Sequence, residues 1–203
     1  MSSVVASMPP QLDPGVLTAS VETRRGVLGM SWTIATEASL FVILFFAYFF
    51  LNHGAIRWPN EPPKLTLAFV MLVALLASSA VIAWGERQLS AGFQVRARGA
   101  IVTTILMGLI FLGIQAEEYR EHLRTLKPTS NTYGSIFYTI VSFHAAHVVA
   151  GLLILGFTLF LPQLGSATKS PHRPLKAAAL YWHFVDAVWV VVVVVLYVIP
   201  NVR

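Results

Sequence analysis

The sequence predicts an all-α membrane protein that folds as a bundle of five transmembrane helices. Of its 203 residues, 56% are hydrophobic and only 11% are charged, a balance that is unusual for a soluble domain. The mean hydropathy is +0.70. Five apolar runs are long enough to cross a hydrocarbon core of about 30 Å, which takes roughly 20 helical residues. These runs are 27–51, 65–84, 99–116, 133–161 and 177–199.

Two parts of the chain are expected. Residues 1–25, with Pro9, Pro10 and Pro14, predict an irregular and partly disordered arm. Residues 26–203 predict the transmembrane bundle. No apolar core followed by a small-residue cleavage site precedes the first span, so we expect no cleaved signal peptide. The chain has no cysteine, which excludes disulfides and thiolate metal ligands.

The basic residues predict the orientation. The formal net charge is +5, but the basic residues flank the spans, so we expect a membrane surface and no nucleic acid. Arg24-Arg25 precedes the first span, and an inside N-terminus puts eight basic residues inside and six outside. We therefore predict N-in/C-out.

The connections and the second span carry local signals. The first outer loop contains Trp58-Pro59 and Pro62-Pro63, which excludes a helix and favours a fixed extended turn. In the second span, Ser78 and Ser79 either allow close approach of another helix or bond back to their own backbone.

A polar stretch follows the third apolar run. Gln115, Glu118 and Tyr119 lie where that helix reaches the outer membrane boundary, with Glu117 and Arg120 three residues apart. The stretch is either a solvated helix end or a point where Gln115 and Glu118 meet other helices.

Five ionisable residues lie within the apolar runs: Glu37, His144, His147, His183 and Asp186. At about 1.5 Å per residue, Glu37, His147 and Asp186 all lie near mid-membrane. A carboxylate at this depth needs a partner. His147 is the first candidate partner for Glu37, and His144 is the second, which predicts contact between the first and fourth helices.

The same residue types also occur in metal sites, haem sites and proton paths. His144, His147 and Glu37 have metal-ligand character, and two histidines of different helices can ligate a haem, but hydrogen bonding between helices explains them more simply. No metal site is predicted. A proton relay through Glu37, His147, Asp186 and His183 is the sharper alternative, although the spans lack the repeats and broken helices typical of transporters.

The last span contains the run Tyr181–Trp189. His183 and Asp186, three residues apart, share one helix face, and Trp182 and Trp189, seven apart, share a neighbouring stripe. We interpret these four residues as an interhelix packing motif, and we expect the partner of Asp186 on another helix.

Several motifs together resemble subunit III of the haem–copper respiratory oxidases. The run from Tyr181 to Trp189 resembles the family signature, and the resemblance extends over about residues 26–198. The other matching segments, in family order, are Glu37 with Phe41 and Phe45-Phe46, Trp58-Pro59, Gln115-Ala116-Glu117-Glu118-Tyr119, Tyr133-Gly134-Ser135, and Ser142–Val148 followed by Gly151.

The resemblance implies a non-catalytic accessory subunit of a proton-pumping oxidase that transfers electrons from cytochrome c to oxygen. Such a subunit carries no cofactor; haem and copper belong to partner subunits. It packs on subunit I, beside subunit II and in some complexes a small subunit IV, and supports proton uptake and oxygen access. Alternatives are the same subunit in a quinol oxidase, an accessory protein of nitric oxide reductase, and a free-standing proton or ion transporter.

The resemblance also has two departures. Longer family members have seven helices, so five spans imply a short form of the bacterial inner membrane that lacks the first two. Lys176 stands where the longer members have a glutamate. With Lys169, His172 and Arg173 it makes a basic inner loop, which favours bound anionic phospholipid headgroups or simply reflects ordinary positive-inside residues.

Overall fold

A computed structural model describes residues 14–53, 65–125, 128–129, 131–161 and 173–202. Within these ranges every regular element is helical, and five helices are long and apolar enough to span a membrane. The predicted all-α, five-span fold is thus confirmed. The elements are α1 (Pro14–His53), α2 (Leu65–Ser90), α3 (Gln94–Thr125), α4 (Thr132–Phe160), α5 (Arg173–Val192), the π-helix η2 (Val193–Val198) and α6 (Ile199–Val202).

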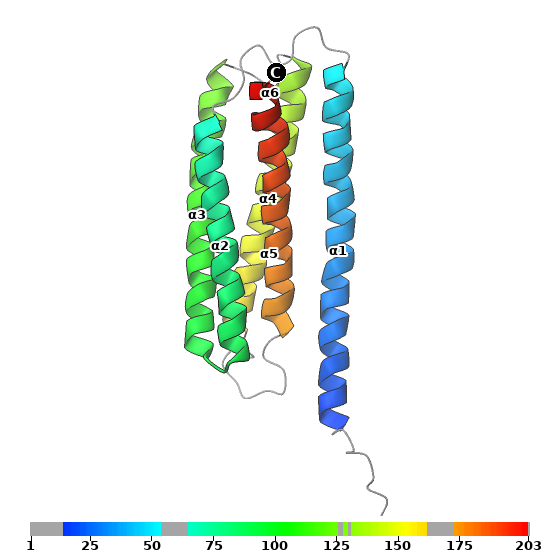
Figure 1. The fold of residues 1–203 in the computed structure, drawn as a ribbon, viewed down its shortest axis with the longest axis vertical. Coiled ribbons are helices and arrows are strands. Elements are labelled where there is room, and N and C mark those ends of the chain that lie inside the picture. The colour runs from blue at the N-terminus through cyan, green and yellow to red at the C-terminus, as the bar shows by residue number, and fades with distance from the viewer. Residues whose placement is uncertain (1–13, 54–64, 126–127, 130, 162–172, 203) are drawn as a thin grey trace, which may run out of the picture.

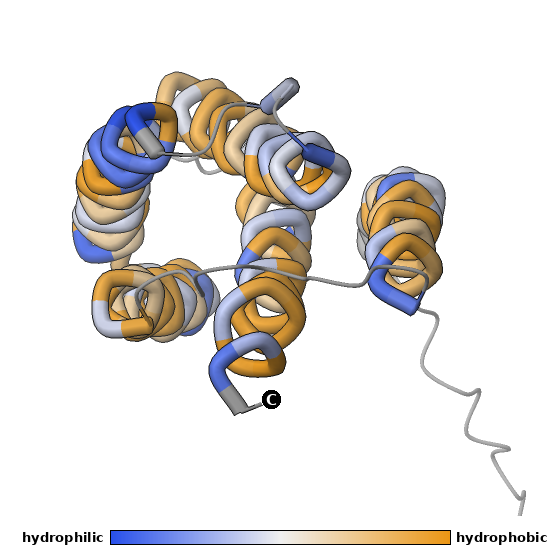
Figure 2. Tube along the Cα trace, turned by 90° about the horizontal axis from the view of Figure 1, so that it is seen from above, coloured by the Kyte–Doolittle hydropathy of each residue, from blue (hydrophilic) through white to orange (hydrophobic). Residues whose placement is uncertain are grey.

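The helices run up and down, and α1 stands at the side of the others (Figure 1). Helix α2 contacts α3 and α5, and α4 also contacts both α3 and α5. These four helices, the four-helix group, surround one common centre when seen end-on (Figure 2). Helix α1 packs on α4 and α5 from outside. The end that holds α6 and the start of α4 is called the C-terminal end of the bundle.

Helix α1 begins earlier than expected. Residues 14–25 were predicted to belong to an irregular arm, but the helix starts at Pro14. Proline fits the first helical position, because its missing N–H would have no partner there and its fixed φ suits a helix. Residues 1–13 and the predicted turn around Trp58-Pro59 lie outside the described residues.

Local sequence signals fix the ends of α2 and α4. Gly92 has φ +88°, a left-handed conformation that favours glycine, and it lets the Phe93 N–H donate to the Gln88 carbonyl at 2.9 Å. Asn131 caps α4, since its side chain accepts a hydrogen bond of 2.6 Å from the Gly134 N–H. The glycine turn thus ends α2 just before α3, and the asparagine cap marks the start of α4.

The contact between α2 and α3 depends on small residues. A Cβ atom added to Gly85 would lie only 2.6 Å from the Cβ of Ala100. Lipid tails are as apolar as the helix surface, so the hydrophobic effect does not drive helices together inside the membrane. Close backbone packing of this kind is therefore a main source of helix association there.

Trp182 of α5 fills the centre of the four-helix group. Its side chain is fully buried and lies against Gly108 of α3 and Gly151 of α4, where an added Cβ would come within 2.8 and 2.9 Å of the indole ring. Its Nε1–H donates to the Ser78 hydroxyl of α2 at 2.9 Å. One side chain therefore contacts the other three helices of the group.

The last span contains a π-helical segment that the sequence analysis did not anticipate. In η2 the backbone widens, and the Ile199 N–H donates to the Val194 carbonyl five residues earlier. Pro200 follows directly and has no N–H to give to Leu196, which accounts for broken α-helical bonding here. The wider turn leaves Leu196 and Tyr197 fully buried.

Substituting Gly108 or Gly151 by alanine is expected to destabilise the bundle by about 1–3 kcal/mol, because the new methyl group overpacks against the rigid Trp182 ring. The measurement is thermal unfolding of the purified protein in detergent. Gly156→Ala is the matched control, since no atom lies within 4 Å of its added Cβ and alanine is the better helix former. Equal melting temperatures for Gly151→Ala and Gly156→Ala would contradict the prediction.

Candidate functional site

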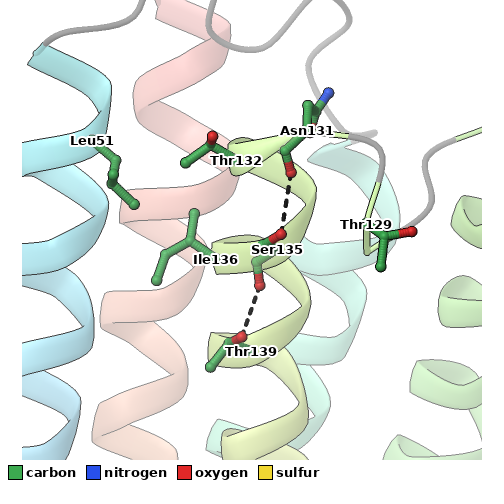
Figure 3. Close-up of a pocket in the computed structure, with 7 residues that line it drawn as sticks. All are labelled: Leu51, Thr129, Asn131, Thr132, Ser135, Ile136 and Thr139. Carbon is green, nitrogen blue, oxygen red and sulfur yellow. Dashed lines mark hydrogen bonds between the residues drawn. The ribbon is translucent and has the colours of Figure 1, made fainter.

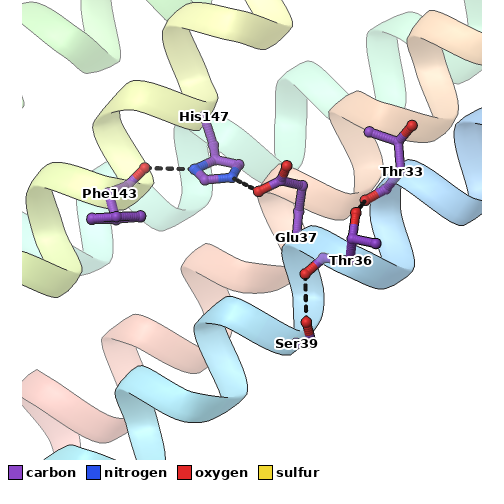
Figure 4. A network of polar contacts seen from close by, with 6 residues as sticks. All are labelled: Thr33, Thr36, Glu37, Ser39, Phe143 and His147. Atoms are coloured by element: carbon purple, nitrogen blue, oxygen red, sulfur yellow. Dashed lines mark hydrogen bonds and ion pairs between the residues drawn. The ribbon is translucent and has the colours of Figure 1, made fainter.

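Glu37 of α1 and His147 of α4 form a pair at mid-span. The Nε2 atom of His147 lies 3.1 Å from Oε2 of Glu37, and Nδ1 of the same ring lies 2.6 Å from the Phe143 carbonyl oxygen (Figure 4). The predicted pairing of these two residues, and with it the contact between the first and fourth helices, is confirmed.

The hydrogen bonds of His147 define its chemistry. A carbonyl oxygen only accepts, so Nδ1 carries a proton and donates to Phe143. Nε2 then either donates to a carboxylate or accepts from a carboxylic acid. In both forms the net charge of the pair is zero, which lets two ionisable groups lie within the membrane span.

The surroundings of the pair are aromatic. The ring centroid of His147 lies 4.9 Å from that of Phe41 and 6.4 Å from that of Phe184. The His147 side chain is 11% exposed and the Glu37 side chain 32% exposed. The carboxyl group thus lies at the edge of the α1–α4 contact and not in the interior.

His144, the second candidate partner of Glu37, lies elsewhere. Its side chain is fully buried and stacks on Trp189 with 4.7 Å between ring centroids. Phe111 of α3 packs edge-on against both rings. His144 therefore belongs to the interior of the four-helix group, although it is only three residues from His147.

The predicted packing motif of α5 faces several neighbours. Trp182 and Trp189 are both fully buried, and Nδ1 of His183 lies 2.5 Å from the Ser79 hydroxyl of α2. Ser78 bonds back to the Leu75 carbonyl of its own helix, as one of the two alternatives expected, and it also accepts from Trp182 of α5.

Asp186 of α5 faces Ser79 of α2, a residue on another helix as expected. The carboxyl group is buried and lies beside Ser79, but neither carboxyl oxygen has a well-aligned hydrogen-bond partner among the described residues. The Ser79 hydroxyl also shares a hydrogen bond with Nδ1 of His183, as donor or as acceptor according to the tautomer of the ring.

The proposed four-residue relay is divided by α5. Glu37 and His147 lie where α1 meets α4, near Phe184, whereas His183 and Ser79 join α5 to α2. Neighbouring residues on a helix point about 100° apart, so His183 and Phe184 face different helices. No hydrogen bond among the described residues links the two pairs.

The polar cluster at the C-terminal end meets other helices. Gln115 and Glu118 are buried, and the Tyr197 hydroxyl of η2 donates to Oε1 of Glu118 at 3.2 Å. Tyr119 packs edge-on against Tyr138 of α4. Glu117 and Arg120 form an exposed pair, 3.1 Å apart. The role of Tyr197 was missed by the sequence analysis.

A shallow pocket of about 480 Å³ lies between the end of α1 and the start of α4 (Figure 3). The Ser135 hydroxyl in it donates to the Pro128 carbonyl, and the Thr139 hydroxyl donates to the backbone carbonyl of Ser135. These hydrogen bonds stabilise the first turns of α4, so the pocket residues that make them have a structural role there. The lining residues are Leu51, Thr129, Asn131, Thr132, Ser135, Ile136 and Thr139.

The basic residues predicted to bind phospholipid are only partly described. Lys169 and His172 lie outside the described residues. Arg173 begins α5, and Lys176 is exposed one turn later, near Glu86 of α2. Within the described ranges, no three His, Asp or Glu side chains come together in a group that could hold a metal ion.

Comparison with known proteins gives one family. A family model described as "Cytochrome c oxidase subunit III" matches residues 15–200. Similar curated proteins are the cytochrome c oxidase subunit 3 of Arabidopsis thaliana, 34% identical, and of Triticum aestivum, 35% identical; each alignment covers 81% of this chain and 64% of the relative. That of Branchiostoma lanceolatum is 33% identical over 83% of this chain and 67% of the relative.

The chain thus spans about two thirds of the length of these relatives, and slightly less for the two plant proteins. The match includes all five transmembrane helices, the Glu37–His147 pair and the Trp182 contacts. The chain belongs to the cytochrome c oxidase subunit III family.

Proposed function

We propose that the chain is the non-redox accessory subunit III of a proton-pumping haem–copper terminal oxidase in aerobic respiration, with cytochrome c as electron donor and oxygen as acceptor. The observation that carries this proposal is the family match over residues 15–200, with relatives named cytochrome c oxidase subunit 3. Haem and copper are assigned to partner subunits.

The arrangement of polar residues supports an accessory role. Glu37, His147, Ser78 and His183 are each engaged in contacts between helices. Such contacts hold a bundle together and leave few groups free for chemistry. We assign to the chain the stabilisation of subunit I, with support of proton uptake and oxygen access in the same complex, beside subunit II and a small subunit IV.

The outer surface of α1 suits a lipid or transmembrane partner. Its apolar side chains include Trp32, Phe46 and Phe50, all at least 70% exposed. An apolar surface of this size is stable in hydrocarbon or against another helix. Phospholipid and subunit I are the proposed contacts, and the bacterial inner membrane is the proposed location.

The orientation belongs to this proposal. With the N-terminus inside, the α2–α3 turn faces the cytoplasm and the start of α4 faces outward. The natural chain has no cysteine, so single introduced cysteines report the sidedness directly.

In intact cells, Thr129→Cys is expected to react with a membrane-impermeant maleimide, whereas Ala91→Cys is expected to react only after permeabilisation. Both positions are exposed in the structure. The unmodified chain is the blank. The reverse labelling pattern would show an N-out orientation.

Isolation of the native complex tests the proposed function. An affinity tag on this chain is expected to co-purify haem- and copper-bearing subunits, and the preparation is expected to oxidise cytochrome c with oxygen. Quinol oxidation without cytochrome c oxidation, or nitric oxide reduction, would assign the chain to a different complex. Proton or ion transport by the chain alone in vesicles would refute the accessory role.

Glu37→Ala is expected to lower the stability or sustained turnover of the complex without removing haem. Loss of one partner leaves His147 Nε2 without a hydrogen bond, at a cost of about 1–3 kcal/mol, toward the lower end because the pair is partly exposed. The measurements are thermal inactivation and the haem spectrum.

Two variants control this experiment. Glu37→Gln keeps a hydrogen-bonding side chain and should lose less stability than Glu37→Ala. Thr36→Ala removes a neighbouring hydroxyl that bonds only to the Thr33 carbonyl of its own helix, and should be nearly neutral. A missing haem signal in Glu37→Ala would contradict the structural assignment of the pair.

A further inference from the structure

The hydroxyl group of Ser79 on α2 lies between an acid and a base of α5. Its oxygen is 2.5 Å from Nδ1 of His183, and the carboxyl group of Asp186 lies against the same hydroxyl. His183 and Asp186 are three residues apart on α5, which places both on one helix face. One hydroxyl group of a neighbouring helix thus contacts both ionisable side chains.

Asp186 and His183 lie at different depths. Asp186 is 3% exposed, and it lies about 20 Å along the helix axis from Arg173, where α5 begins. His183 is half-buried and lies about 4.5 Å nearer to the start of the helix. The acid is therefore the closed end of this group of three residues, and the ring is its open end.

The ionisable groups of α1 and α4 that lie near this part of α5 have contacts of their own. Glu37 of α1 and His147 of α4 pair with each other at 3.1 Å. His144 of α4 stacks on an indole ring in the interior. In the part of the chain that the structure describes, no ion pair joins Asp186 or His183 to either helix.

Helices α2 and α3 place their charged groups toward the bundle ends. Glu86 of α2 follows Ser79 by seven residues, about two turns, and lies near Lys176. Glu118 of α3 accepts a hydrogen bond from the tyrosine of η2 near the other end. The described residues thus place no outside charge next to the acid and the ring.

Without an outside charge, the group must be neutral as a whole, because an unbalanced charge in a membrane span is costly. Neutrality requires one proton beyond those of the serine hydroxyl and the neutral imidazole ring. That proton lies on the carboxyl group, beside a neutral ring, or on the ring as imidazolium, beside a carboxylate. Both forms have zero net charge, so the proton can move between them without a charge entering the span.

We propose that Asp186, Ser79 and His183 form a proton-holding site between α2 and α5, in which the serine hydroxyl passes the proton between the buried acid and the half-buried ring. A carboxylic acid donates, a hydroxyl group both donates and accepts, and an unprotonated Nδ1 accepts. The carboxyl O–H bond breaks as its proton binds to the serine Oγ, and the serine O–H bond breaks as that proton binds to Nδ1. Rotation about χ2, which is broad for aspartate, aligns the carboxyl group with the hydroxyl.

Hydrogen–deuterium exchange followed by infrared spectroscopy of the native complex tests this site, because the C=O band of a carboxylic acid shifts when deuterium replaces its proton. The band that is lost in Asp186→Asn belongs to Asp186. After transfer to heavy water, this band is expected to shift several-fold more slowly in Ser79→Ala than in the natural protein. An equal rate, or the absence of a carboxylic-acid band from Asp186, would overturn the proposal.

The direction of the effect separates proton transfer from a merely structural contact. If Ser79 only held the helices together, its loss would loosen the contact, admit water and speed the exchange. Ser79→Thr keeps the hydroxyl and should keep the natural rate. Ser90→Ala is the matched control, since the Ser90 hydroxyl bonds to the Glu86 carbonyl of its own helix, and it should also leave the rate unchanged.

His183→Phe gives a second measurement. It keeps an aromatic ring but removes the nitrogen that receives the proton, so it is expected to slow the exchange at Asp186 as Ser79→Ala does. An unchanged rate in His183→Phe would contradict the role of His183. If Ser79→Ala does not assemble, the comparison of His183→Phe with the natural protein decides the question. The infrared signal does not depend on the electron donor of the complex, so this result is separate from the test of the proposed function.

Discussion

The position of Trp182 is the constraint on which the four-helix group depends. Its indole ring needs the space above Gly108 and Gly151, because a methyl group at either position would come within 3 Å of the ring. Its N–H needs the Ser78 hydroxyl. In lipid, helices associate through close packing and hydrogen bonds and not through exclusion of apolar surface from water. Trp182 supplies both interactions and contacts α2, α3 and α4 at once.

The fixed rotation of α5 then sorts the polar side chains. With Trp182 directed into the centre, His183 reaches Ser79 of α2 and Phe184 reaches Phe41 of α1. Asp186 and Trp189 follow within two turns and face the interior. The Glu37–His147 pair is left on the α1 side. One tryptophan contact thus separates two polar regions that lie at similar depth.

Depth and chemical need made part of this structure predictable. The five spans followed from composition and length, and Glu37 was assigned to His147 because an acid in hydrocarbon needs a partner at its own level. The same argument could not choose the partner of Asp186, since depth says nothing about rotation around the helix axis. For the same reason His144 was predicted as a second partner of Glu37. The two histidines are three residues apart, but His147 contacts Glu37 and His144 stacks on Trp189.

Other features depend on local geometry that periodicity does not encode. The π-helix η2 turns Tyr197 toward Glu118, and an apolar run such as 193–198 looks identical in α- and π-helical form. The early start of α1 at Pro14 was hidden because three prolines in the first 14 residues suggested irregular structure. A proline breaks a helix only inside it, and at the first position it favours one.

The attachment of α1 shows how a neutral polar pair serves a weakly packed helix. The residues that hold α1 are Glu37, Phe41 and Tyr48, spaced by four and seven along one narrow face; Phe41 and Tyr48 are buried, while most of the helix is exposed. A narrow apolar strip does little to fix the rotation of α1 about its own axis, because apolar contacts are not directional. The bond to His147 is directional and fixes both the register and the rotation of α1. It does so without net charge in either protonation form, so the rest of α1 remains free to contact lipid or a partner subunit.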